Sequence, residues 1–345
     1  MGRAAPLSVP RSADIHVRAA VLFLAGMSPS PTPAKASSPA EYAAALQVDP
    51  AALEARAPAP EEADAVLRPY LAASHASPAP FPAIAMEILE LVRYPDVDLE
   101  ELARYIRVDG ALAGGVLALA NSAVYRAVRR IDTIREAVGR LGMSEVARLS
   151  AAIAMRTLYS PDASRAHQAF EATWRLLFQH AVTVARCASE LARQQLVPTP
   201  GTEQTFMAGL LHDVGLAAAL RATAELVSYG KLALVPEPGL GHLLVRVHVE
   251  AGVELHKGWQ LPPTLAEVAA HHHGPVPETE LAPLVHLVRL VSAFDLLRRA
   301  PAMHPRAPAE IADSASALGL PPARVTALAA DLDAAGAWVA TAFPS

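Results

Sequence analysis

The sequence predicts an all-α protein, and three observations carry that prediction. From Pro82 to about residue 340, apolar residues recur at helical spacing, and the apolar–polar alternation of strands is nearly absent. Signals for helix starts and stops recur along the same stretch. Hydrophobic residues make up 52% of the chain and charged residues 18%, which is typical of a folded body and not of a disordered chain.

The first 75 residues are predicted to be a disordered or linker-like region. Residues 27–60 are rich in Pro, Ser and Ala, and residues 61–74 are compatible with one helix. The apolar run at residues 18–26 resembles the start of a signal peptide, but it is too short to cross a bilayer. We expect no export, and we keep Met1 and Met27 as alternative starts of the chain.

A first helical block is predicted over residues 76–160, as a bundle of about five helices. Its boundary signals are two capping boxes, one turn, and one helix stop followed by the next N-cap: Asp98 with Glu101, Thr133 with Glu136, Asp109-Gly110, and Gly142 with Ser144. The block carries no evident chemistry. A C-terminal extension over residues 301–345 is predicted to add two helices, with Trp338 and Phe343 closing the core.

A second helical block, over residues 165–300, holds the candidate functional residues. The apolar segment Phe206–Leu216 is predicted as one helix with the pair His212–Asp213 at its end. A carboxylate beside so much apolar surface must be paired or metal-bound, because burying a bare charge is costly. Other polar candidates follow on successive predicted helices: His180, near the start of a helix over Leu177–Leu191, then His248, Glu250, His271, His272, His273, Ser292 and Asp295.

Each of these residues has an ordinary structural interpretation when it is taken alone. A single helical histidine is more often hydrogen-bonded in a core than bound to a metal, and the histidine run could complement a helix dipole. Glu250 and Asp295 could be surface carboxylates, and we interpret His256, His286 and His304 as surface or structural residues. The set as a whole differs, because it lies on successive helices that can converge on one point.

Charge and cysteine content limit the classes of partner. The net charge is −5, so no overall basic field attracts nucleic acid, and we expect no nucleic-acid partner. The single cysteine, Cys187, excludes an internal disulfide and fits a reducing cytosol, and its surroundings predict a core thiol. No segment approaches transmembrane length, so we expect a cytoplasmic protein with no membrane partner.

The order of these residues resembles the HD superfamily of metal-dependent phosphohydrolases, and most closely its HDOD branch, the HD-related output domain of bacterial signalling proteins. The resemblance covers about residues 78–300 and rests on these stretches: FPAIAMEILELVRYPDVDLEELARYIRVDGAL, LALANSAVY, AGLLHDVGL, HVEAGVELHKGWQLPP and LAEVAAHHHGP. It implies two packed helical subdomains, the second an HD-like bundle. It also implies that the groove between the two blocks takes a ligand or partner.

The resemblance further implies a set of metal ligands. His180, His212 and Asp213 would hold one divalent metal, and His248 with His272 or His273 would serve a second. Mixed nitrogen and oxygen ligands suit Fe, Mn, Zn or Mg. In active relatives the metal lowers the pKa of a bound water, and the resulting hydroxide attacks a phosphoester.

The sequence departs from the active pattern at the late carboxylate ligand. Ser292 stands where active HD enzymes supply an aspartate, and Asp295 follows one turn later. Leu216 stands where a lysine is common, and HHHGPVP replaces the Gly-Tyr-Pro stretch of cyclic-dinucleotide phosphodiesterases. We therefore expect a bacterial signalling output or regulatory module that is non-catalytic, has a vestigial metal site or no metal, and binds an unidentified protein or small ligand. The alternative is a metal-dependent phosphohydrolase acting on a nucleotide or cyclic dinucleotide.

Overall fold

The described part of the chain is helical throughout. The computed structural model describes residues 61–73, 81–92, 97–125, 129–160, 165–233, 239–299 and 304–343, and these ranges contain no strand. The all-α prediction is therefore confirmed, and residues 61–74 do contain a helix, α4 (Glu61–Ala72). The predictions for residues 1–60, including the apolar run at 18–26 and the choice between Met1 and Met27, lie outside the described residues.

The first block contains the five helices that the sequence predicts. They are α5 (Ala83–Leu91), α6 (Leu99–Arg107), α7 (Gly110–Ala120), α8 (Ile134–Leu141) and α9 (Met143–Met155), followed by the 3-10 turn η1 (Arg156–Tyr159). Two predicted caps form: Asp98 accepts from the backbone N–H of Glu101 at 2.7 Å, and Thr133 caps α8. At the predicted turn Asp109-Gly110, Asp109 also caps α7. These caps satisfy backbone donors that would otherwise lack partners at the helix starts.

One predicted cap is wrong. Ser144 does not cap α9, because α9 begins at Met143 and Gly142 serves both as the end of α8 and as the residue before α9. Gly142 has a φ of 85°, a backbone conformation that residues other than glycine rarely adopt. The chain turns within this single residue, so no separate N-cap position is left between the two helices.

The second block differs from the predicted boundaries in two places. Its helices are α10 (Arg165–Ala169), α11 (Glu171–Arg193), α12 (Thr202–Leu211), α13 (Val214–Ser228), α14 (Gly239–Gly258), α15 (Pro263–His271) and α16 (Ala282–Arg299). Helix α11 begins before the predicted start at Leu177, so His180 lies well inside it. The predicted helix Phe206–Leu216 is two helices, α12 and α13, that meet at His212 and Asp213.

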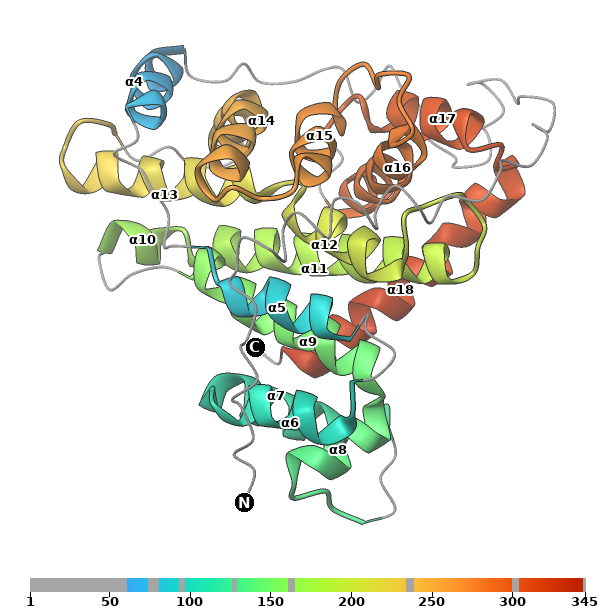
Figure 1. Cartoon of the computed structure of the whole chain (residues 1–345). Coiled ribbons are helices and arrows are strands. Elements are labelled where there is room, and N and C mark those ends of the chain that lie inside the picture. The colour runs from blue at the N-terminus through green and yellow to red at the C-terminus, as the bar shows by residue number, and fades with distance from the viewer. Residues whose placement is uncertain are drawn as a thin grey trace, which may run out of the picture.

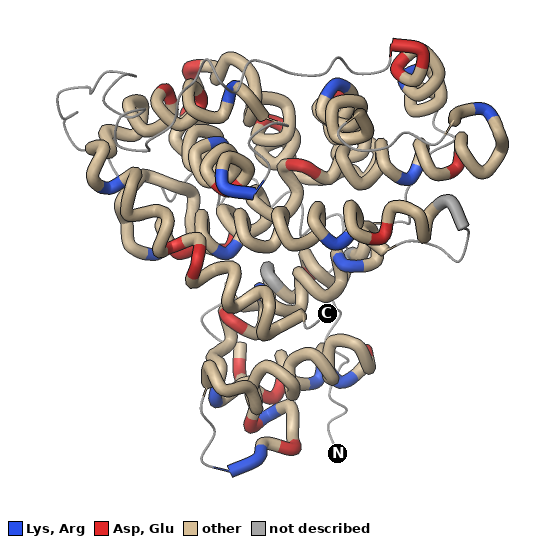
Figure 2. The backbone as a smooth tube through the Cα atoms, turned by 180° about the vertical axis from the view of Figure 1, so that it is seen from behind, with Lys and Arg blue, Asp and Glu red and all other residues tan. Residues whose placement is uncertain are grey.

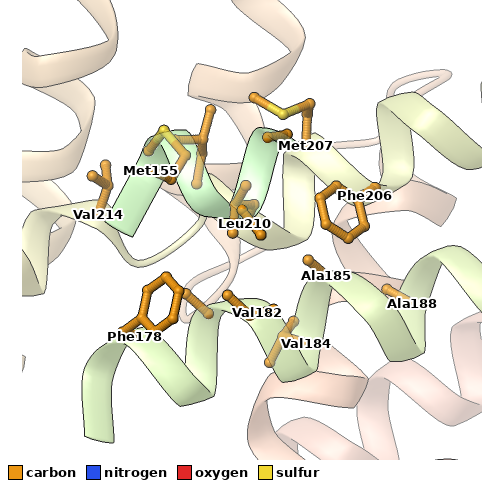
Figure 3. Close-up of a cluster of buried hydrophobic side chains, with 14 of the residues drawn as sticks. Met155, Phe178, Val182, Val184, Ala185, Ala188, Phe206, Met207, Leu210 and Val214 are labelled. Carbon is orange, nitrogen blue, oxygen red and sulfur yellow. The ribbon is translucent and has the colours of Figure 1, made fainter. Parts of the chain in front are cut away.

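The two blocks share one apolar core. Figure 1 shows α11 and α12 between the first block on one side and α13 to α16 on the other. At the junction, Met155 from α9 lies among apolar side chains of α11, α12 and α13, as Figure 3 shows for Phe178, Leu210 and Val214. A fully buried Val, Leu, Met or Phe side chain contributes about 1.5–3 kcal/mol to folding. The blocks are therefore packed subdomains of one folded unit.

The C-terminal extension is part of that unit. Helix α17 (Ala307–Ala317) packs on α16, and α18 (Pro322–Ala342) runs back along α11 to reach α7 (Figure 1). Trp338 and Phe343 are buried, as the sequence predicts. At the other end of the described chain, α4 packs on α13 and α14, with ion pairs from Arg246 to Asp64 and from Arg68 to Glu250.

A buried carboxylate joins the first block to the extension. Glu145 on α9 accepts hydrogen bonds from Trp338 Nε1 at 2.7 Å and from the hydroxyl of Tyr125. Its other oxygen pairs with Arg148 and Arg186. Burial opposes the charge, but Arg186 and the other partners outweigh it and hold the pKa of Glu145 below its ordinary value. One charged group thus ties α9, α11 and α18 together.

The surface carries mixed charge. In Figure 2, acidic and basic positions are interspersed over the helices and do not gather into one basic patch on the described residues. None of the described helices is long and apolar enough to cross a membrane. Cys187 is buried, as predicted for a core thiol.

Replacing Gly215 by alanine should destabilise the protein. A Cβ at this position would lie 1.9 Å from the carbonyl oxygen of His248 and 2.6 Å from the nitrogen of Gly252, so α13 and α14 would have to separate. We expect Gly215→Ala to lower the free energy of unfolding by about 3 kcal/mol or more in urea titrations. The matched control is Gly139→Ala in α8, where a Cβ meets open space and should add about 0.5 kcal/mol of stability. Equal stability of the two variants would contradict the close approach.

Glu145→Gln should destabilise the protein in a pH-dependent manner. The neutral amide leaves Arg148 and Arg186 without their shared carboxylate, at a cost of about 2 kcal/mol at neutral pH, because Arg186 is partly exposed and the loss is smaller than for a fully buried pair. Because the pKa is lowered in the folded state, the charge of Glu145 stabilises the fold fully at pH values above its ordinary pKa of 4.5. This stabilisation is lost as the pH falls toward the folded-state pKa. The stability difference between wild type and variant should therefore shrink below pH 4.5 in a series of urea titrations, and a constant difference would contradict this role.

Candidate metal centre

The centre is built around Asp213, in the two-residue connection between α12 and α13. Helix α12 ends at Leu211 and α13 begins at Val214, so His212 and Asp213 lie where four helices of the second block face one another. Gly215 allows the backbone of α14 to approach this connection. Asp213 is 3% exposed. The sequence therefore places a carboxylate in a site where its charge requires partners.

One oxygen of Asp213 faces a first pair of histidines. Asp213 Oδ2 lies 3.4 Å from Nε2 of His180, on α11, and 3.3 Å from Nε2 of His212. These three residues form a group whose ligand atoms lie within 4.8 Å of one another. Asp213 Oδ2 is buried and has no hydrogen-bond partner among the described residues.

The other oxygen of Asp213 faces a second pair. Asp213 Oδ1 lies 2.9 Å from Nε2 of His272, after α15, and 3.3 Å from Nε2 of His248, on α14. The two imidazole nitrogens are 3.3 Å apart. His273 belongs to the same group of ligand atoms within 4.8 Å. The carboxylate of Asp213 thus bridges two sets of histidines.

Backbone carbonyls orient three of these imidazoles. In each, Nδ1 bonds the carbonyl three residues earlier in the chain: His212 to Gly209 at 2.7 Å, His248 to Val245 at 2.8 Å, and His272 to Ala269 at 2.8 Å. A carbonyl oxygen only accepts, so Nδ1 must carry the proton in each ring. In the neutral ring the lone pair of Nε2 then points at Asp213, which is the tautomer that binds metals.

This arrangement fits a metal ion better than it fits direct hydrogen bonding. Neutral imidazole Nε2 atoms and an ionised carboxylate are all acceptors, so the centre lacks donors unless a cation or a proton enters. Ligands at about 2.0–2.1 Å from a tetrahedral metal are about 3.3 Å apart, close to the separations of His180, His212 and His248 from Asp213. Imidazole and carboxylate together suit Zn, Fe or Mn. The residues present therefore fit a divalent metal.

Ser292 and Asp295 have different places in the centre. Ser292 Oγ lies 3.0 Å from Nε2 of His212 and 3.3 Å from Nε2 of His180, so the serine faces the ligand atoms of the first pair. Asp295 lies on the other side of His180, with Oδ2 2.8 Å from Nδ1, and Arg299 donates to its Oδ1 at 2.8 Å. Asp295 therefore orients His180 from behind and does not take the place of the absent ligand.

The electrostatics follow from burial and these contacts. Burial alone would lower the pKa of His180, but its contacts with the carboxylates of Asp213 and Asp295 raise it to about 9. Burial lowers the pKa of His212, and it lowers that of His248 to about 4. Burial opposes the charge of Asp213, yet the surrounding histidines hold its pKa well below the ordinary value. His212 and His248 are therefore neutral beside an ionised carboxylate, as metal binding requires, whereas His180 has to release a proton when a metal binds.

Other histidines have partners outside the bridged group. His256 and His304 are buried, so neither is a surface residue; Nδ1 of His256 bonds the carbonyl of Gly252 at 2.7 Å. His286 is part-buried and contacts Ser314, and His271 contacts the carbonyl of Pro275. These contacts of His256, His271 and His286 are structural. Glu250 is an exposed carboxylate paired with Arg68, and Leu216 is buried in the core.

The sequence did not point to Tyr159 or Glu310. Tyr159 comes from the first block, and its ring contacts that of Phe178 at a tilt. Its buried hydroxyl has no hydrogen-bond partner among the described residues, and burial followed by the charge of Asp213 raises its pKa. Glu310 comes from α17 and contacts His273 and His304. Neither residue belongs to the local motifs, so only the packing of distant helices could identify them.

Comparisons with known proteins agree with this architecture. A family model for the HDOD domain matches residues 79–275. An "Uncharacterized protein" of Treponema pallidum (strain Nichols) is 29% identical over 60% of this chain, and the match spans only 40% of that relative's length. Activities or partners of such a longer protein cannot be transferred to this chain as a whole.

Two crystal structures share the fold. An HDOD domain protein with unknown function from Geobacter sulfurreducens is 21% identical, with a TM-score of 0.53 over 97% of this chain and 100% of that one. A protein named "Putative metal-dependent phosphohydrolase", from Shewanella amazonensis SB2B, is 19% identical, with a TM-score of 0.52 over 75% of this chain and 100% of that one. At these identities the likeness establishes the fold alone. The family model, however, covers more than half of the 345 residues, and the chain therefore belongs to the HDOD family.

Proposed function

We propose that this protein is a bacterial, cytoplasmic signalling output module that does not catalyse a reaction and acts by binding a protein partner or a small ligand. The observation that carries the proposal is the position of Ser292. Its hydroxyl faces Nε2 of both His180 and His212, where an anionic ligand would complete the first metal set. Since Nδ1 of His212 carries the proton, the serine hydroxyl donates to the lone pair that a metal would use.

Burial of the centre supports a non-catalytic role. Each side chain of the bridged group other than His273 is no more than 3% exposed, so a phosphoester has no route to the ligand atoms without movement of the surrounding helices. Hydrolysis requires the substrate and the attacking water to meet at the metal. A closed centre is instead suited to holding helices in one arrangement.

The centre can couple an input to the shape of the module. Asp213 joins α12 and α13, and the histidines around it come from α11, α14 and the end of α15. A metal bound there would stabilise the folded arrangement of these helices in proportion to its free concentration. Gain or loss of the metal would therefore change the rigidity of surfaces that a partner contacts.

Metal-dependent hydrolysis of a nucleotide or cyclic dinucleotide is the alternative. It is favoured by the tautomers of His212, His248 and His272, which are set for ligation, and by the bridging position of Asp213. A bound metal would supply a hydroxide at neutral pH. Asp295 would orient His180, and burial would exclude competing water.

Metal binding without turnover is the expected result for the purified protein. Manganese at about 100 times its dissociation constant should raise the free energy of unfolding by about 2.7 kcal/mol, and Asp213→Asn should abolish that gain. Hydrolysis of bis(p-nitrophenyl) phosphate should equal that of His212→Ala. Glu250→Gln, an exposed carboxylate on α14, is the control and should keep the gain. Turnover in the wild type that His212→Ala removes would establish the hydrolase instead.

Ser292→Asp should restore an anionic ligand. The new carboxylate would face His180 and His212, and we expect manganese to bind at least about tenfold more tightly, a change of about 1.4 kcal/mol in binding free energy measured by calorimetry. Ser292→Asn, of the same size but without the charge, is the matched control and should not bind more tightly than wild type. Unchanged affinity in Ser292→Asp would show that position 292 is not the missing ligand position.

A further inference from the structure

A second cluster of potential ligands lies where the C-terminal extension meets the centre. It consists of His273, after α15, His304, before α17, and Glu310, in the first turn of α17. Their ligand atoms lie within 4.8 Å of one another. Two of the three residues follow the segment that the HDOD family model matches, so the cluster depends on the extension.

The contacts within the cluster centre on the carboxylate of Glu310. His304 Nε2 lies 2.7 Å from Oε2, and His273 Nδ1 lies 3.3 Å from both Oε1 and Oε2. His273 Nδ1 is equally far from both Glu310 oxygens, and both distances exceed the usual range of about 2.7–3.2 Å for an N–H···O hydrogen bond. The contact is therefore a poor hydrogen bond. The same separation of about 3.3 Å is expected between two ligands of one tetrahedral metal.

The side chains of the cluster are largely buried. Glu310 and His304 are both 6% exposed, and the side chain of His273 is 15% exposed. A buried carboxylate requires compensation by charge or by well-formed hydrogen bonds. The two imidazoles can supply hydrogen bonds to this carboxylate, whereas a divalent cation held by all three side chains would compensate its charge directly.

The cluster also settles which histidine serves which group of ligands. His272 has the short contact to Asp213, at 2.9 Å, and so completes the bridged centre with His248. The ring centroids of His273 and His272 are 4.1 Å apart, but Nδ1 of His273 faces Glu310. Two adjacent residues at the end of α15 thus point their ligand atoms at two different carboxylates.

We propose that His273, His304 and Glu310 form a separate binding site for a zinc-class divalent cation, which fastens the C-terminal extension to the HDOD domain. Two imidazoles and one carboxylate are a ligand set that zinc takes in proteins, with a fourth position left for water. The cation would join the end of α15 to α17. The site differs from the bridged centre because His304 and its carboxylate ligand, Glu310, belong to this cluster alone.

The test counts zinc equivalents in the full chain after removal of metal with a chelator. Asp213→Asn removes the bridging carboxylate of the first centre and should keep one tightly bound zinc per chain, measured by calorimetry and elemental analysis. The double variant Asp213→Asn with Glu310→Gln should lose that zinc. With cobalt in place of zinc, the Asp213→Asn protein should show the intense visible absorption of a tetrahedral site. The double variant should not show it.

Controls make the result specific to this cluster. Asp313→Asn alters an exposed carboxylate on the same helix and should leave the zinc count unchanged. In the wild-type background, Glu310→Gln and His304→Asn should each bind one equivalent fewer than wild type, which covers the case in which Asp213→Asn fails to fold. Equal zinc counts with and without Glu310, or a folded Asp213→Asn protein that binds none, would overturn the proposal. Neither result bears on whether the bridged centre is catalytic.

Discussion

The buried charge of Asp213 is the constraint on which the second block depends. A carboxylate almost without exposure must be compensated, and here four imidazoles, two within helices and two at helix ends, surround its two oxygens. Gly215 removes the side chain that would otherwise keep α14 away. Backbone carbonyls and Asp295 then fix the outer nitrogen of each ring. The inward nitrogens are therefore set before any metal arrives, so binding does not require the rings to reorient.

The contacts that orient the candidate ligands are distinct from the features that hydrolysis would require. Ligand orientation depends on contacts inside the second block, and all of those contacts are present. A hydrolytic reaction needs more, namely an anionic ligand at position 292 and an open path to the metal. Ser292 supplies a neutral hydroxyl, and the surrounding side chains are closed over the ligand atoms. This combination of oriented ligands, reduced charge and restricted access is what the proposed non-catalytic role requires.

The blocks and the extension are coupled through polar groups as well as through apolar packing. Glu145 joins α9 to α11 and to Trp338 of α18, while Glu310 of α17 reaches the end of α15. Both carboxylates are buried and both depend on partners far away in the sequence. A change at either carboxylate would therefore affect more than one part of the fold.

Local sequence determined the helices, most of their caps, and the identity of the residues around Asp213. Capping boxes such as Thr133 with Glu136 are local, because their hydrogen bonds span three residues, and the periodicity that predicts helices is local as well. The motif order also identified candidate ligands: His180, His212, Asp213, His248, and His272 or His273. Only the tertiary structure decided that Asp213 bridges two groups, that Asp295 stands behind His180, and that His273 turns toward Glu310. These facts depend on distances between helices that are far apart in the chain, and no spacing along the sequence records such distances.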